Sequence, residues 1–179
     1  MTVVDIIKQY DFNLAYAFAL VQDIPDEQMT ITPAFGLENH PAWTLGHLIS
    51  GSAGIAEDLG AKFEMPDKWT DLFLRKGPGD PRKPDSDKSK YPSKELLLHE
   101  LEHQHTKVKK ILTNINVIAL DKKIKWRFSN QMPTLKDLTI FMCITHEQCT
   151  WDNLRHGDVQ WNYHQLLLPY DTNIKTTSQ

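Results

Sequence analysis

Cysteine is scarce in this sequence, which has two in 179 residues, Cys143 and Cys149. They lie six residues apart in one stretch that we expect to be helical. Because an α-helix turns by about 100° per residue, the two side chains point roughly 240° apart and cannot form a disulfide within that helix. The cysteine content therefore favours a reducing compartment.

Long apolar runs and an excess of basic residues are also missing. No segment approaches the roughly 18 uninterrupted apolar residues of a membrane-spanning helix. The first eight residues do not combine a basic stretch with an apolar one, as a secretory signal does. The formal net charge is −3, and the lysines of 83–94 and 107–125 alternate with acidic and apolar residues. We therefore expect a cytoplasmic protein that binds neither membranes nor nucleic acid.

The motifs of nucleotide-binding and serine-hydrolase sites are absent as well. The sequence has no GxGxxG, no P-loop and no GxSxG, and so lacks both a phosphate-binding loop and a serine nucleophile turn. Cys149 is the one candidate nucleophile, because it follows His146 by three residues on the same side of the expected helix. The alternative is a small buried cysteine without a catalytic role. We assign no catalytic residue from the sequence.

One segment, His99-Glu-Leu-Glu-His103, matches the HExxH motif of zinc proteases, in which two histidines bind the metal and the glutamate activates water. Here, however, the apolar stripe of the surrounding helix passes through Leu98, Leu101 and His105, which leaves His99 and His103 on the polar face. We expect a solvent-exposed pair rather than a protease site. His105, which interrupts the apolar stripe, is expected to be a core histidine with a buried partner rather than a metal ligand.

What the sequence does contain is apolar residues at three- and four-residue steps, the pattern of amphipathic helices. The expected helices span residues 2–22, 41–60, 93–115 and 134–156. With 40% hydrophobic residues, the chain is long enough to bury one core. We predict an all-α fold in which residues 1–179 form a single four-helix-bundle domain. The signals at the helix ends are Pro41 in a first turn, Ser93 as an N-cap, Thr134 and Asp137 as a capping box, and Gly60 and Gly157 as stops.

The connections between these helices differ in length. A long crossover, 61–92, joins the second and third helices, and its prolines and charges predict irregular structure with a short turn around Lys68–Arg75. A crossover of this length inside a compact domain usually has a function or covers another part of the structure. Residues 116–133 are expected to form a short extended excursion. The tail 158–179 is expected to be irregular, with its first half packed on the bundle.

A helical wheel gives the inward face of each helix. The faces comprise Val3, Ile7, Tyr10, Leu14, Phe18 and Val21 in the first helix; Leu98, Leu101, His105, Val108, Leu112 and Ile115 in the third; and Leu135, Leu138, Met142, His146, Cys149 and Asn153 in the fourth. The fourth helix has a second apolar face with Ile140, Ile144 and Trp151. A helix that is apolar on two sides is central in its bundle or part of a subunit interface, and we expect a homodimer that uses this face.

Two histidines are the main candidates for a functional site. His146 points inward, as either a core histidine with a buried partner or a ligand. His47 lies on a face with Gly46, Ser50 and Gly54, whose small side chains leave space beside the ring. That space can admit another helix or a ligand, and periodicity does not decide between them. If both imidazoles bind one ion, their nitrogens must lie within about 3–4 Å of each other.

Four phrases in this order resemble the DinB-like or YfiT-like metalloprotein superfamily. They are Asn39-His-Pro-Ala-Trp-Thr-Leu-Gly-His47, Trp69-Thr-Asp-Leu-Phe, Tyr91-Pro-Ser-Lys-Glu-Leu, and the segment from Pro133-Thr-Leu to His146-Glu. The resemblance implies a four-helix bundle, often dimeric, that holds a divalent metal with three histidines. One comes from the second helix and two come from the fourth in an HxxxH arrangement. His47 and His146 match the first two ligands, and Thr150 stands at the third position.

The resemblance also implies an activity, because characterised relatives are S-transferases and isomerases that use low-molecular-weight thiols. We therefore expect a divergent metal-dependent thiol transferase that binds Zn²⁺ or Ni²⁺ and a small-molecule substrate. For the missing ligand, Cys149 is preferred to Asp152 because it is closer in angle to His146; two histidines completed by water are a further possibility. The alternative hypothesis is a non-catalytic binding module with a vestigial metal site.

Overall fold

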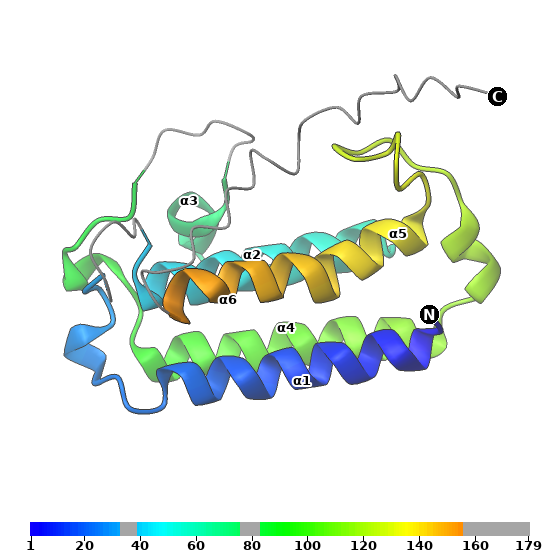
Figure 1. The fold of residues 1–179 in the computed structure, drawn as a ribbon. Coiled ribbons are helices and arrows are strands. Elements are labelled where there is room, and N and C mark those ends of the chain that lie inside the picture. Colours follow the sequence, from blue (N-terminus) through cyan, green and yellow to red (C-terminus); the bar gives the residue numbers. More distant parts are fainter. Residues whose placement is uncertain (33–38, 76–82, 156–179) are drawn as a thin grey trace, which may run out of the picture.

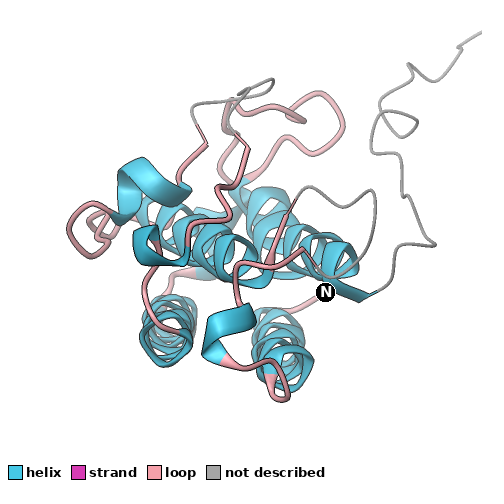
Figure 2. Cartoon of the chain, turned by 90° about the vertical axis from the view of Figure 1, so that its left-hand side faces the viewer, coloured by secondary structure: helices cyan, strands magenta, loops and turns pink. Residues whose placement is uncertain are grey.

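Helices dominate the part of the chain that this computed structural model describes, residues 1–32, 39–75 and 83–155 (Figure 1). The long helices are α1 (Val3–Val21), α2 (Pro41–Asp58) and α4 (Lys94–Asn114), with a composite fourth stretch of α5 (Leu135–Ile140), a π-helical segment (Phe141–His146) and α6 (Glu147–Arg155). In Figure 1, α2 and the composite stretch form one layer above α1 and α4, and the end view in Figure 2 shows the same two layers. The all-α prediction is confirmed.

The helix ends form where local sequence signals place them. The capping box of Thr134 and Asp137 is complete: each backbone N–H donates to the other residue's side chain, at 2.9 and 3.2 Å. Ser93 caps α4 as predicted, and Pro41 occupies the first turn of α2. The cap of α2 was not predicted: Nδ1 of His40 accepts a hydrogen bond from a backbone N–H one turn later. These contacts are local, which is why the sequence reveals most of them.

Of the connections that are described, the crossover has its predicted short turn, whereas the excursion 116–133 consists mostly of turns and is not extended as expected. The short helix α3 (Trp69–Phe73) lies within the predicted turn of the crossover, and a 3₁₀ turn (Lys88–Lys90) precedes α4. The excursion 116–133 begins with a 3₁₀ turn (Val117–Asp121), followed by a single antiparallel bridge between Lys123 and Thr134. None of the described helices is long and apolar enough to span a membrane. The predicted stop at Gly157 and the tail 158–179 lie outside the described residues.

The buried face of α1 is rotated from the predicted one. Its buried residues are Ile6, Tyr10, Asn13, Ala17 and Val21. Leu14 and Ile7 are only partly buried, and Phe18 is 36% exposed. The prediction followed the largest apolar side chains, whereas the helix instead buries a polar residue, Asn13, which finds hydrogen-bond acceptors in the opposite helix.

The fourth stretch departs from a regular α-helix at Phe141–His146, where the turns are π-helical. From this segment onward the predicted inward residues Met142, His146 and Cys149 are each only partly buried, and the next residue in each case, Cys143, Glu147 and Thr150, is the buried one. A π-helical turn holds an extra residue, so the inward face shifts by one position. The predicted stripe was wrong after Leu138 for this reason.

The second apolar face of this stretch is buried inside the chain. Trp151 is 1% and Ile144 is 9% exposed, each in one of the two core clusters, and the partly buried Ile140 packs against the cluster of Ile144. The prediction that this face forms a subunit interface was therefore wrong, because the face is central in the protomer. Homodimerisation itself stays a prediction from the family resemblance.

Candidate metal centre

His47 of α2 and His146, at the end of the π-helical segment, meet between their helices. Their Nε2 atoms lie 3.2 Å apart, within the range expected for two ligands of one ion. Gly51 leaves room for this approach, since an added Cβ there would lie 3.3 Å from Cε1 of His146. Trp43, one turn before His47, stacks on its ring with centroids 4.9 Å apart. The structure thus brings together the two histidines that sequence analysis selected.

Burial keeps both imidazoles neutral. It lowers the pKa of His47 to about 3, and the neighbouring His146 and Arg75 act in the same direction, while a backbone contact with Phe73 acts in the opposite one. Burial also lowers the pKa of His146 to about 4. A neutral imidazole has one N–H and one lone pair. The pair can therefore share one N–H···N hydrogen bond, or turn both lone pairs toward one cation.

The donor set fits two ligands of a divalent ion. Two nitrogens bound to one ion at about 2.0–2.1 Å lie about 2.9–3.4 Å apart for right-angled to tetrahedral geometry, which includes the observed distance. His47 Nδ1 is buried without a hydrogen-bond partner, whereas metal-binding histidines usually donate this second N–H to an acceptor. The arrangement therefore matches a weak or open site, with remaining positions for water or a small molecule.

A third protein ligand is not brought to the pair. Within the described ranges, no three His, Cys, Asp or Glu side chains converge, so Cys149 does not join the two histidines. The extra residue of the π-helical segment places Thr150, not Cys149, on the buried side. The Thr150 hydroxyl donates to the backbone oxygen of His146 at 2.7 Å, as helical threonines often do. The side chain of Asp152, the other candidate, lies outside the described residues.

Polar contacts from α1 hold the π-helical segment. Asn13, which is 1% exposed, donates from Nδ2 to the carbonyl oxygens of Cys143 at 3.0 Å and Ile144 at 3.5 Å. Its Oδ1 accepts from Nε2 of Gln148 at 3.5 Å. The wide turns of a π-helix leave carbonyl groups that need other donors, and Asn13 supplies one. It thereby braces the chain on both sides of His146.

A buried acid–base pair lies directly beside the candidate site. His105 Nε2 is 2.9 Å from Oε1 of Glu147, and both side chains are almost fully buried. Burial raises the pKa of Glu147, although His105 acts in the opposite direction. The imidazole also stacks on Tyr10 at 3.7 Å, and the Tyr10 hydroxyl donates to Ser52 at 2.7 Å. The prediction that His105 is a core histidine with a buried partner is confirmed.

The histidines of the HExxH segment and the two cysteines were the remaining candidates from the sequence. His99 and His103 are exposed on α4, as expected of a polar face, and His103 lies 3.5 Å from Glu100. Cys143 is buried, and burial raises the pKa of its thiol. Cys149 is partly exposed and free of disulfide bonding. It stays a candidate nucleophile to which the sequence assigns no catalytic role.

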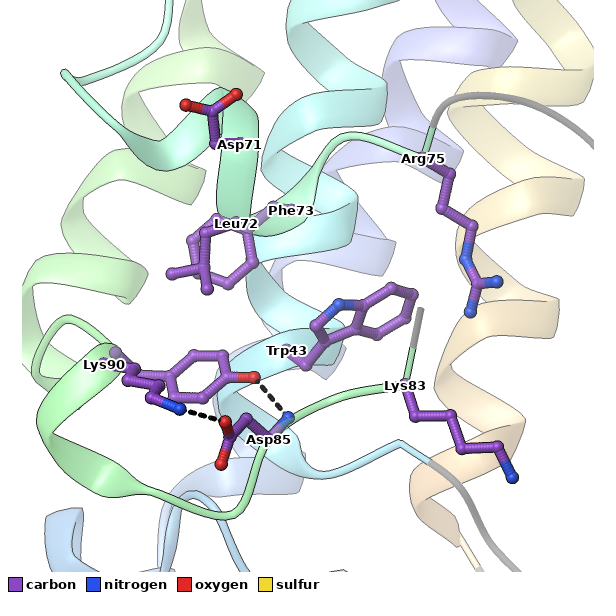
Figure 3. A pocket seen from close by; sticks show the side chains of 9 residues that line it. Trp43, Asp71, Leu72, Phe73, Arg75, Lys83, Asp85 and Lys90 are labelled. Carbon is purple, nitrogen blue, oxygen red and sulfur yellow. Dashed lines mark hydrogen bonds and ion pairs between the residues drawn. The ribbon is translucent and has the colours of Figure 1, made fainter. Parts of the chain in front are cut away.

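The crossover forms a pocket against Trp43. The pocket has a volume of about 310 Å³ and is lined by Trp43, Asp71, Leu72, Phe73, Arg75, Lys83, Asp85, Lys90 and Tyr91 (Figure 3). All of these residues except Trp43 belong to the crossover 61–92. The pocket and the histidine pair share Trp43, which lines the first and stacks on His47 of the second.

The space beside His47 admits another helix at Gly46. A Cβ added at Gly46 would overlap the ring of Phe73 from α3. We expect Gly46→Ala to lower the free energy of unfolding by about 1–3 kcal/mol, because Phe73 is buried and must move. Urea denaturation measures the change.

The matched control is Gly54→Ala on the same helix, where nothing lies within 4 Å of the added Cβ. There the higher helix propensity of alanine is expected to raise the free energy of unfolding by up to about 1 kcal/mol. If both substitutions changed the free energy of unfolding in the same direction, the proposed overlap with Phe73 would be contradicted.

Comparison with known proteins agrees with this geometry. The sequence profile of the DinB superfamily matches residues 9–148, a range that includes His47 and His146 and ends just before Cys149 and Thr150. No curated protein and no protein of solved structure shows significant similarity to the chain. Because the match extends over most of the sequence and over both site histidines, the chain belongs to the DinB superfamily.

Proposed function

We propose that this chain is a divalent-metal-dependent enzyme of the thiol S-transferase type, in which His47 and His146 hold Zn²⁺ or Ni²⁺. The observation that carries the proposal is the 3.2 Å separation of the Nε2 atoms of two neutral, partly buried imidazoles, contributed by α2 and the composite helix. A low-molecular-weight thiol is the proposed substrate. Bound to a thiol, a divalent ion lowers its pKa and yields a reactive thiolate at neutral pH.

The protein's own residues would bind and orient. Trp43 fixes the ring plane of His47 by stacking, and the brace of Asn13 fixes the backbone that carries His146. Burial keeps both rings unprotonated, so their lone pairs are available without loss of a proton. The pocket formed by the crossover would hold the second substrate beside Trp43.

A second candidate is a non-catalytic binding module that keeps the scaffold and not the metal. The observation that favours it is at Thr150, whose hydroxyl donates a hydrogen bond to a backbone oxygen of its own helix. Tight metal sites usually have three or four protein ligands, and the described residues supply two. Metal binding separates the two candidates.

The test measures metal content after loading with Zn²⁺ or Ni²⁺ and removal of free metal. The background is His99→Ala/His103→Ala, because two exposed histidines one turn apart can chelate metal on their own. We expect up to about one equivalent per chain in this background and a loss of at least about tenfold with His47→Ala.

Apparent stability provides a second measurement, because an ion that binds the native state raises the melting temperature. The rise should be present in the background variant and absent with His47→Ala. Less than roughly a tenth of an equivalent in the background, unchanged by His47→Ala, would rule out the metal enzyme and favour the binding module.

A further inference from the structure

The pocket beside Trp43 has an uneven distribution of charge. At one end, Lys90 forms an ion pair with Asp85, and the Tyr91 hydroxyl accepts the backbone N–H of Asp85 at 2.9 Å. On the opposite side of Figure 3, the guanidinium of Arg75 lies beside the indole of Trp43, and the side chain of Lys83 runs away from it. Among the described residues, the lining has three cationic and two acidic side chains, and so an excess of one positive charge. That excess matches a monoanion.

Arg75 is the group in the pocket that can bind an anion. Its guanidinium carbon lies over the Trp43 ring, 4.7 Å from the centroid. A guanidinium that stacks through its face keeps its five N–H donors in plane and available for the two oxygens of a carboxylate. Within the described ranges no carboxylate forms an ion pair with Arg75.

The other charged residues of the wall are already engaged. Asp71 and Lys83 each make a further interaction, so Arg75 is the residue on which anion binding depends. In Figure 3 the carboxylate of Asp71 points away from Trp43 and does not face Arg75 across the pocket.

The remaining walls are apolar. Aromatic and aliphatic surface is supplied by Trp43, Leu72, Phe73 and Tyr91. The ring centroids of Phe73 and Tyr91 lie 6.1 Å apart. Ligand pockets range from about 300 to 1,000 Å³, so about 310 Å³ suits a small molecule rather than a nucleotide.

We propose that this pocket binds a small monocarboxylate with a short apolar body. The carboxylate lies against the N–H edge of Arg75, and the apolar body lies against Trp43 and Leu72. That such a molecule is the substrate rests on the function proposed above, whereas its binding does not require metal.

The test compares 4-phenylbutyrate with the neutral 4-phenylbutyramide, which has the same shape, on the metal-free full chain. Titration by nuclear magnetic resonance gives both affinities, and the Trp43 indole signal, identified with Trp43→Phe, gives the location. We expect the acid to bind at least about threefold more tightly than the amide, because a charge-assisted hydrogen bond is only partly screened at an exposed site.

Arg75→Gln should remove this preference and leave amide binding unchanged. Lys125→Gln, which removes an exposed charge outside the pocket lining, is the matched control and should keep the preference. Equal binding of acid and amide by the wild type, an unchanged preference in Arg75→Gln, or no shift of the Trp43 signal would each overturn the proposal. Because the titrations are made without metal, failure of metal binding would leave this result intact.

Discussion

Lowering the pH from about 7 to about 4 is expected to reduce the free energy of unfolding of the metal-free protein by about 6 kcal/mol through His47 and His146. Their folded pKa values of about 3 and about 4 lie below the usual 6.5. Above pH 6.5 both histidines are mostly neutral in the folded and in the unfolded chain, so they do not change the free energy of unfolding. Between 6.5 and the folded values, the unfolded chain binds protons that the folded chain does not, so stability falls as the pH falls.

Urea denaturation at several pH values in the presence of a chelator measures this slope. His47→Gln should make it shallower, whereas His103→Ala, which removes an exposed histidine, should leave it unchanged. The raised pKa of Glu147 makes the protein more stable as the pH falls, which is opposite to the effect of the two histidines. Because Glu147 is present in all three proteins, it does not affect the comparison between them. A wild-type slope no steeper than that of His47→Gln would contradict the expectation.

The second large effect is expected from His105→Ala, which should lower the free energy of unfolding by about 3–5 kcal/mol. The substitution leaves the carboxyl group of Glu147 buried without its partner at 2.9 Å and removes the stack on Tyr10. Equilibrium unfolding by urea, followed by circular dichroism, measures the loss.

A double-mutant cycle separates the pair from its surroundings. His105→Leu and Glu147→Met should each be strongly destabilising, because each leaves one polar group unpaired. The double variant should lose much less than the sum, since an apolar pair of similar volume can replace a buried ion pair at little cost. Additive losses would show that the two side chains do not act together.

Much of the helix layout could be predicted because the responsible interactions are local. Pro41, Ser93 and the box of Thr134 and Asp137 act within one turn, and the structure has each where it was expected. Helix faces were less predictable. They depend on what lies opposite, and both errors, at Asn13 and after Leu138, arise where one helix supplies hydrogen bonds to another.

The same distinction holds for the site. The resemblance selected His47 and His146, and they converge. The partner of His105 was missed although Glu147 directly follows His146, because an α-helical wheel turns Glu147 away from the inward face and the π-helical segment turns it back. The neighbours of His47 show the limit of periodicity, since small residues open a space whose occupant, Phe73 at Gly46, comes from a distant segment.

The π-helical segment has an evolutionary consequence. One residue more than an α-helix needs is accommodated between Phe141 and His146, and the buried positions on both sides keep their partners. Chain length can therefore change by one residue here without displacing the core, but loss of the extra residue would leave Asn13 without its acceptors. Insertion or deletion at this turn and the identity of residue 13 should consequently change together as the sequence diverges.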